Sequence, residues 1–220
     1  MFVWACGFEL AIGLIGLLIA GILGIDARAY LPKLDELDWH SVGRDCLIGA
    51  AASIPMLISI AALMRIPHNS IVAIKRLSDA PMMKALLSLS YPELIVLSVC
   101  AGIGEEVAFR GCLLPWLTAL EDPSFVNPYD VGDTFLLAEP SMLMAAILFS
   151  SIAFGLLHPI TKLYVFVATL MGMFFAVLMI ATDSLLVPIV THIVYDAAQF
   201  ALAKRESSQS PAAETADAAG

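Results

Sequence analysis

The chain has 220 residues, of which 60% are hydrophobic and only 14% are charged, and its formal net charge is -9. Soluble domains are about 45–50% apolar and about 25% charged, so this composition predicts an integral membrane protein. The acidic balance argues against a nucleic-acid partner, because a nucleic-acid-binding surface needs clustered Lys and Arg. The expected surroundings are therefore a lipid bilayer, and the expected fold class is an all-α, polytopic membrane helical bundle.

Six segments are long and apolar enough to cross a bilayer, which takes about 20 apolar residues in a helix. In chain order they are Phe2–Ile25, Cys46–Met64, Leu94–Leu120, Ser141–Leu157, Leu163–Ala181 and Ser184–Ala203. The first follows no basic residue and exceeds the apolar region of a signal peptide, so we interpret it as a retained transmembrane helix. The third is over-long with a polar middle, which predicts a tilt or a water-filled cavity. The last two, separated only by Thr182 and Asp183, predict a tight helical hairpin.

The connecting regions differ in character. Pro67–Tyr91 mixes basic and apolar residues, as an interfacial amphipathic helix does. Glu121–Pro140 has five acidic residues and no basic one, and we assign it no function. We expect one transmembrane domain over residues 1–203 and a disordered cytoplasmic tail over 204–220, because the tail is rich in Ser, Ala and acidic residues. The four cysteines show neither a disulfide framework nor metal-ligand spacing.

The Lys and Arg residues of the connections predict the orientation in the membrane. With six spans, seven of these residues lie on the side of the termini, and the other side receives only Arg28, Lys33 and Arg44. Because the more basic side of a membrane protein is usually cytoplasmic, we expect cytoplasmic termini. We expect the location to be the plasma (inner) membrane of a prokaryote.

Three polar clusters lie within the apolar segments. Ionisable groups at membrane depth are costly, and they are functional candidates by default. The first cluster is the pair Glu105 and Glu106, which opens the string EEVAFR and is followed by Arg110. Glu106 and Arg110 are four residues apart, so they are expected to pair on one helix face. Glu105 is rotated from Glu106 by about 100°, which leaves it as a candidate base.

The second and third clusters each contain a histidine. His158 follows Phe154 by four residues in FGLLH, so the aromatic ring is expected to pack on the imidazole. His192 and Asp196 are four apart in HIVYD, and the carboxylate could accept from the imidazole and fix its tautomer. Outside these clusters the spans hold few ionisable residues, chiefly Glu9.

Each cluster alone is compatible with helix packing, but three on separate apolar segments predict one shared polar cavity. A carboxylate with two imidazoles can activate water and stabilise an oxyanion, as acyl hydrolysis requires. The same groups, Glu105, His158 and His192, could alternatively bind zinc, whose catalytic sites use two His and one carboxylate. The sequence has neither the H-E-x-x-H motif of zinc proteases nor a G-x-S-x-G nucleophile motif.

Taken in order, EEVAFR, FGLLH and HIVYD resemble the E-E-x-x-x-R, F-x-x-x-H and H-x-x-x-[Asn/Asp] motifs of the CPBP intramembrane proteases. This family, also called ABI, includes the type II CAAX prenyl endopeptidases, and the resemblance covers about residues 93–203. It implies a glutamate-dependent endopeptidase that needs no cofactor and forms no covalent acyl-enzyme. The implied substrate is a membrane-associated peptide or protein, with CAAX-type lipidated proteins as one class.

The resemblance also implies roles for individual residues. Glu105 would be the general base on water, assisted by His158, and His192 with Asp196 would form the oxyanion site. Glu106 and Arg110 would organise the others. Asp196 stands where the prenyl proteases usually have Asn, and an ionised Asp accepts hydrogen bonds but donates none.

Two other functions use the same ionisable residues. One is a non-catalytic membrane immunity or assembly factor that retains the polar clusters, and the other is a proton-coupled transporter. The complete set of motifs favours the protease over the first. The transporter is disfavoured because the sequence shows no inverted repeat.

Overall fold

The structure is a computed structural model that describes residues 1–33, 35, 37–76, 80–120, 135 and 138–217, with side chains up to residue 207. Its helices, in chain order, are α1 (Phe2–Leu23), α2 (Trp39–Leu63), α3 (Asn69–Lys75), α4 (Pro81–Leu87), α5 (Tyr91–Glu106), the π-helical segment η2 (Val107–Leu113), α6 (Leu114–Thr118), α8 (Pro140–Leu156), α9 (Lys162–Thr182) and α10 (Leu186–Asp217). The described residues contain no strand. The all-α prediction is therefore confirmed.

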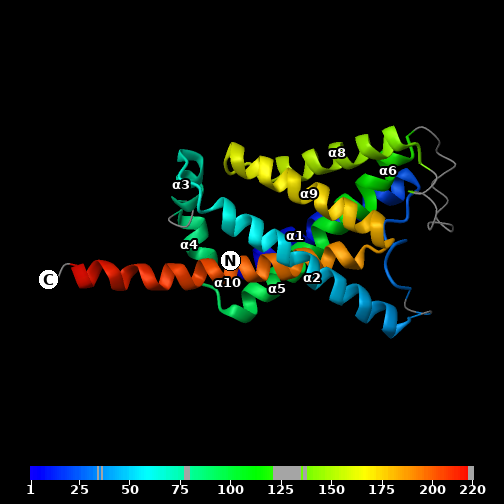
Figure 1. Cartoon of the computed structure of the whole chain (residues 1–220). Coiled ribbons are helices and arrows are strands. Elements are labelled where there is room, and N and C mark those ends of the chain that lie inside the picture. Colours follow the sequence, from blue (N-terminus) through cyan, green and yellow to red (C-terminus); the bar gives the residue numbers. More distant parts are fainter. Residues whose placement is uncertain (34, 36, 77–79, 121–134, 136–137, 218–220) are drawn as a thin grey trace.

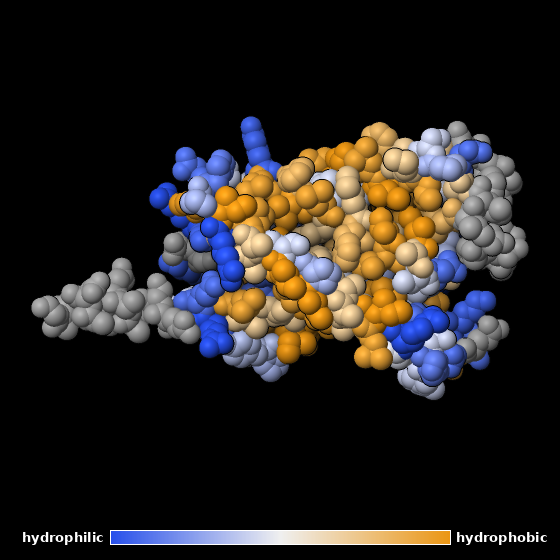
Figure 2. All heavy atoms as spheres, in the orientation of Figure 1, coloured by the Kyte–Doolittle hydropathy of each residue, from blue (hydrophilic) through white to orange (hydrophobic). Residues whose placement is uncertain are grey.

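The helices form a bundle with an apolar belt. Four helical stretches are long and apolar enough to cross a membrane, namely α1, α2, α9 and the Leu186–Ser207 part of α10. The bent unit of α4 with the continuous run α5–η2–α6 is either a fifth, broken span or a re-entrant loop, while α8 is apolar but only 17 residues long. Figure 2 shows hydrophobic residues over the middle of the bundle and hydrophilic residues at its two ends. The six expected segments are helical over most of their lengths, but only four of the described helices, or five with the bent unit, qualify as spans. The chain is a multi-pass integral membrane protein.

A bend of 113° between α4 and α5 precedes the third expected span, Leu94–Leu120. The sequence stops and restarts the helix here, because Ser90 and Glu93 form a reciprocal capping box and Pro92 lies in the first turn of α5. The Lys204 ammonium of α10 donates to the Leu87 and Leu89 carbonyls at 2.6 and 2.7 Å. Helix α10 therefore stabilises the bend between α4 and α5.

Helix α10 runs to Asp217, beyond Ala203 where we expected the last span to end and a disordered tail to begin. The tail contains Ala and Glu residues, which are good helix formers, and it continues a helix that the apolar span has already started. It leaves the bundle as a straight extension (Figure 1).

The opposite end of the bundle is formed by the α9–α10 turn and the α1–α2 connection. Asp183 ends α9 with a φ of 51°, in the left-handed region, and the expected tight hairpin is present. The Leu185 amide donates to the Tyr30 carbonyl at 2.9 Å, which ties the hairpin to the α1–α2 connection. Nearby, Asp38 caps the N-terminus of α2, and its pKa is lowered by hydrogen bonds from the Ser41 hydroxyl and from the amides of His40 and Ser41.

The two ends of the bundle allow the predicted orientation to be tested. Helices α3 and α4 and the C-terminus lie at one end, and the α1–α2 connection lies at the other (Figure 1). In a variant without the four native cysteines, we expect an externally added thiol reagent to label Lys33→Cys but not Lys75→Cys in intact cells. The reverse pattern would overturn the orientation. The acidic segment 121–140, predicted to share the Lys33 side, lies mostly outside the described residues.

Candidate active site

The structure brings all six candidate residues into one cluster. Glu105 and Glu106 end α5 and Arg110 lies in η2, while His158 follows α8 and the last two, His192 and Asp196, lie on α10. The Glu106 and Arg110 side chains are 0% and 1% exposed, whereas those of His158 and Asp196 are 24% and 25% exposed. The cluster is therefore closed on the Arg110 side and open on the side of His158 and Asp196.

Glu106 is held by two cationic or potentially cationic partners. The Arg110 Nη1 donates to Glu106 Oε1 at 3.0 Å, so the predicted ion pair is confirmed. The same oxygen lies 2.9 Å from His192 Nδ1. This carboxylate therefore joins α5 and η2 to α10.

Arg110 is enclosed by groups that the sequence did not reveal. Its Nη2 donates to the Gly172 carbonyl of α9 at 2.9 Å. The guanidinium lies 4.4 Å from the centre of the Phe154 ring, 5.2 Å from that of Phe175 and 5.8 Å from that of Phe109, so three aromatic rings complete its surroundings. Gly172 packs directly on α8, where an added Cβ would come within 3.1 Å of Ser151.

The π-helical segment begins directly after Glu106 and contains Arg110. Such segments are rare and occur often at functional sites, because they change the direction in which side chains leave the helix. In this segment Arg110 pairs with Glu106, and Gly111 packs closely against the backbone of Ala27. No residue pattern in EEVAFRGCL signals a π-helix in advance.

Glu105 faces both histidines. Its Oε1 lies 3.8 Å from His158 Nε2, and its Oε2 lies 4.0 Å from His192 Nε2. Both separations exceed a direct hydrogen bond. His158 Nδ1 lies 3.0 Å from the Phe154 carbonyl oxygen, to which it must donate, so a neutral ring presents the lone pair of Nε2 toward Glu105. The predicted packing of Phe154 on His158 is confirmed, with ring centres 5.0 Å apart.

His192 is oriented mainly by Glu106 and Phe175, and less by Asp196 than the four-residue spacing predicted. Its Nε2 lies 3.4 Å from Asp196 Oδ2, a longer contact than the 2.9 Å between Nδ1 and Glu106. The Phe175 ring stacks on the imidazole with centres 5.1 Å apart and an angle of 13°. Phe175 lies in an apolar run with no polar neighbour in sequence, so no signal pointed to it.

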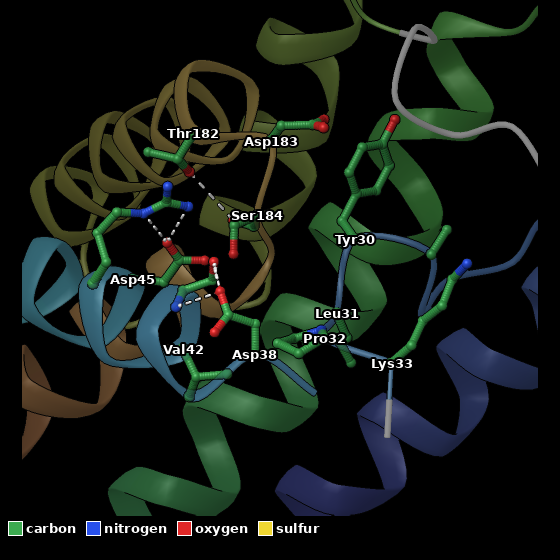
Figure 3. A pocket seen from close by; sticks show the side chains of 13 residues that line it. Tyr30, Leu31, Pro32, Lys33, Asp38, Val42, Asp45, Thr182, Asp183 and Ser184 are labelled. Carbon is green, nitrogen blue, oxygen red and sulfur yellow. Dashed lines mark hydrogen bonds and ion pairs between the residues drawn. The ribbon is translucent and has the colours of Figure 1, made fainter. Parts of the chain in front are cut away.

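A separate pocket of about 330 Å³ lies at the end of the bundle, between the α1–α2 connection and the α9–α10 turn (Figure 3). Arg44 and Asp45 form an ion pair of 3.0 Å in it. It contains none of the six candidate residues. Among the described residues, no group of three or more His, Cys, Asp and Glu side chains is arranged to hold a metal ion.

Comparison with known proteins places the cluster within a family. A family model described as type II CAAX prenyl endopeptidase Rce1-like matches residues 87–198, just over half of the chain. The matched region includes all six candidate residues. No curated protein and no solved structure matches the chain.

Proposed function

Because the chain belongs to the Rce1-like family of type II CAAX prenyl endopeptidases, we propose that it hydrolyses a peptide bond of a membrane-associated substrate with water activated by Glu105. The observation that carries the proposal is the convergence of two imidazole Nε2 atoms on one carboxylate, at 3.8 and 4.0 Å. Glu106 is already bound by Arg110 and His192, so Glu105 is the carboxylate left for proton transfer.

The gap between Glu105 Oε1 and His158 Nε2 suits one water molecule. Two groups 3.8 Å apart can each accept a hydrogen bond of about 2.8 Å from the same water. As the water oxygen bonds to the scissile carbonyl carbon, one O–H bond breaks and its proton passes to Glu105. The proton then moves to the amide nitrogen as the C–N bond breaks, which regenerates the carboxylate. No step needs an enzyme nucleophile.

His192 is the group that would stabilise the oxyanion. Glu106 fixes its Nδ1, and the Phe175 ring stacked on it prevents rotation of the imidazole. As an imidazolium it would donate from Nε2 toward the space in front of Glu105. A donor held in place before the reaction contributes most to stabilising the developing negative charge. Asp196, near this Nε2, would favour the protonated ring.

The exposed side chains of the cluster indicate where a substrate enters. His158 and Asp196 are both about a quarter exposed, while Glu105 behind them is 8% exposed. An extended peptide that reaches the cluster from the His158 side would meet the water between His158 and Glu105 first. With cytoplasmic termini, this approach suits a lipid-anchored C-terminal peptide of the CAAX type, held by its lipid in the surrounding bilayer.

The function is tested with purified protein in detergent or nanodiscs and fluorogenic peptides, both farnesylated CAAX sequences and their unmodified forms. We expect cleavage by enzyme that has been dialysed against a chelator and contains no stoichiometric metal by elemental analysis. If the active protein carries zinc, and if activity disappears on its removal and returns on its addition, the metal-free mechanism is wrong. The zinc alternative would then assign Glu105, His158 and His192 as ligands.

The Asp196→Asn variant separates two roles for Asp196. We expect it to retain activity within about tenfold, because the 3.4 Å contact to His192 is worth on the order of 1 kcal/mol and an amide oxygen can replace it. If Asp196 instead donates to the oxyanion as a protonated acid, Asn should also work, but the pH–rate profile should lose an alkaline limb. Asp196→Ala should be poor in both cases. An inactive Asn variant would refute both roles.

A further inference from the structure

Helix α1 contributes an acidic residue to the site from outside the matched region 87–198. The Glu9 carboxyl group lies within hydrogen-bond reach of the Glu105 carboxyl group. The Oε2 atoms of both glutamates are buried, and neither has a hydrogen-bond partner among the described residues. Two unsatisfied carboxyl oxygens therefore lie on adjoining helices, α1 and α5.

The packing of α1 on α5 fixes this contact. Gly104, directly before Glu105, lies so close to the Glu9 carbonyl that no side chain fits there, and its Cα meets Gly13. One turn further on, Gly16 lies against Ala108. Small residues let two membrane helices approach backbone to backbone, and this approach places the Glu9 side chain beside Glu105.

We propose that Glu9 is a positioning residue, whose carboxyl group donates a hydrogen bond to Glu105 Oε2 and aims Oε1 at the water beside His158. The inference rests on the proposed function, in which Glu105 is the base. Two carboxyl groups can hydrogen-bond only if one of them carries a proton. Since Glu105 must be ionised to accept a proton from water, the shared proton belongs to Glu9. Glu9 touches neither water nor substrate, and it acts through Glu105 alone.

Three substitutions of Glu9 test the positioning role. Glu9→Gln keeps the length of the side chain and supplies an amide N–H donor, so we expect kcat within about threefold of wild type. Glu9→Leu removes the hydrogen-bond donor. Glu9→Asp shortens the side chain by one methylene and so moves the donor away from Glu105. Both should lower kcat by about 10- to 100-fold with little change in KM, because a small displacement of a catalytic group is costly while substrate contacts remain. Phe8→Leu, at a 66% exposed neighbour on the same helix, should leave both constants unchanged.

A second measurement does not depend on activity. Unfolding midpoints in detergent are compared for Glu9→Leu, Glu105→Leu and the double variant, and we expect the double variant to shift less than the two single shifts added together. Additive shifts would show that the carboxyls do not interact, which overturns the proposal. Wild-type kcat in Glu9→Leu, or an equal loss in Gln and Leu variants, overturns the positioning role. If Glu105→Gln is fully active, the proposed function fails instead. The comparison of unfolding midpoints then still shows whether the Glu9 and Glu105 side chains interact.

Discussion

Glu105→Gln is expected to abolish hydrolysis while the protein remains folded. The amide keeps the shape of the side chain and can still hydrogen-bond Glu9 and the water, but it cannot accept a proton. Loss of a general base commonly lowers the rate by about 10²–10⁴-fold. The effect should appear in kcat, measured with the fluorogenic peptide that wild type cleaves best, and KM should change little.

The matched control is Glu93→Gln, the same substitution in the same helix. Glu93 is partly exposed and serves the capping box of α5, a position that Gln also fills well. We expect near-wild-type activity from this variant and an unchanged elution volume in size-exclusion chromatography for both. Substantial hydrolysis by Glu105→Gln would show that the water is activated elsewhere in the cluster.

Sequence reasoning located the spans well because a membrane helix is defined by the length of its apolar run. The predicted first span, Phe2–Ile25, differs from α1 only at its last two residues. The over-long third segment proved to be the composite run α5–η2–α6, preceded by a sharp bend. Its polar middle was visible in sequence, but the π-helical geometry was not, because it depends on how η2 packs against α1 and α8.

The site was predictable where its members are neighbours on one helix. Four-residue spacings indicated the Glu106–Arg110 pair and the packing of Phe154 on His158. The contacts between helices carry no such local signal. Glu106 and His192 are 86 positions apart, and Arg110 and the Gly172 carbonyl are 62 apart.

The preference of His192 for Glu106 over Asp196 illustrates this limit. Spacing alone favoured the residue on the same helix, and the packing of α10 on α5 supplied a closer partner. Glu9 is a second residue whose contact between helices could not be predicted from sequence. It was visible as an isolated acidic residue in an apolar helix, but only the close approach of α1 to Gly104 connects it with Glu105.

Glu106→Gln is expected to damage stability as much as activity. Arg110 is fully enclosed, and the substitution removes the carboxylate that it pairs with, which leaves its charge among neutral groups such as the Gly172 carbonyl and three aromatic rings. Removing one member of a buried ion pair costs about 3–5 kcal/mol, because the other charge stays buried without compensation. We expect a loss of this size in the free energy of unfolding, measured by denaturation of the purified protein in mixed micelles.

Two further variants show whether the unpaired charge is the cause. In Glu106→Gln with Arg110→Met both charges are absent, so stability should recover well above that of Glu106→Gln alone, although the site would remain inactive. Asp26→Asn breaks the exposed Asp26–Arg28 pair, where the Arg28 side chain is 72% exposed, and should have little effect. If Glu106→Gln behaves like Asp26→Asn, the buried pair does not stabilise the bundle. Glu106 would then matter to the site only through the hydrogen bond that it accepts from His192 Nδ1.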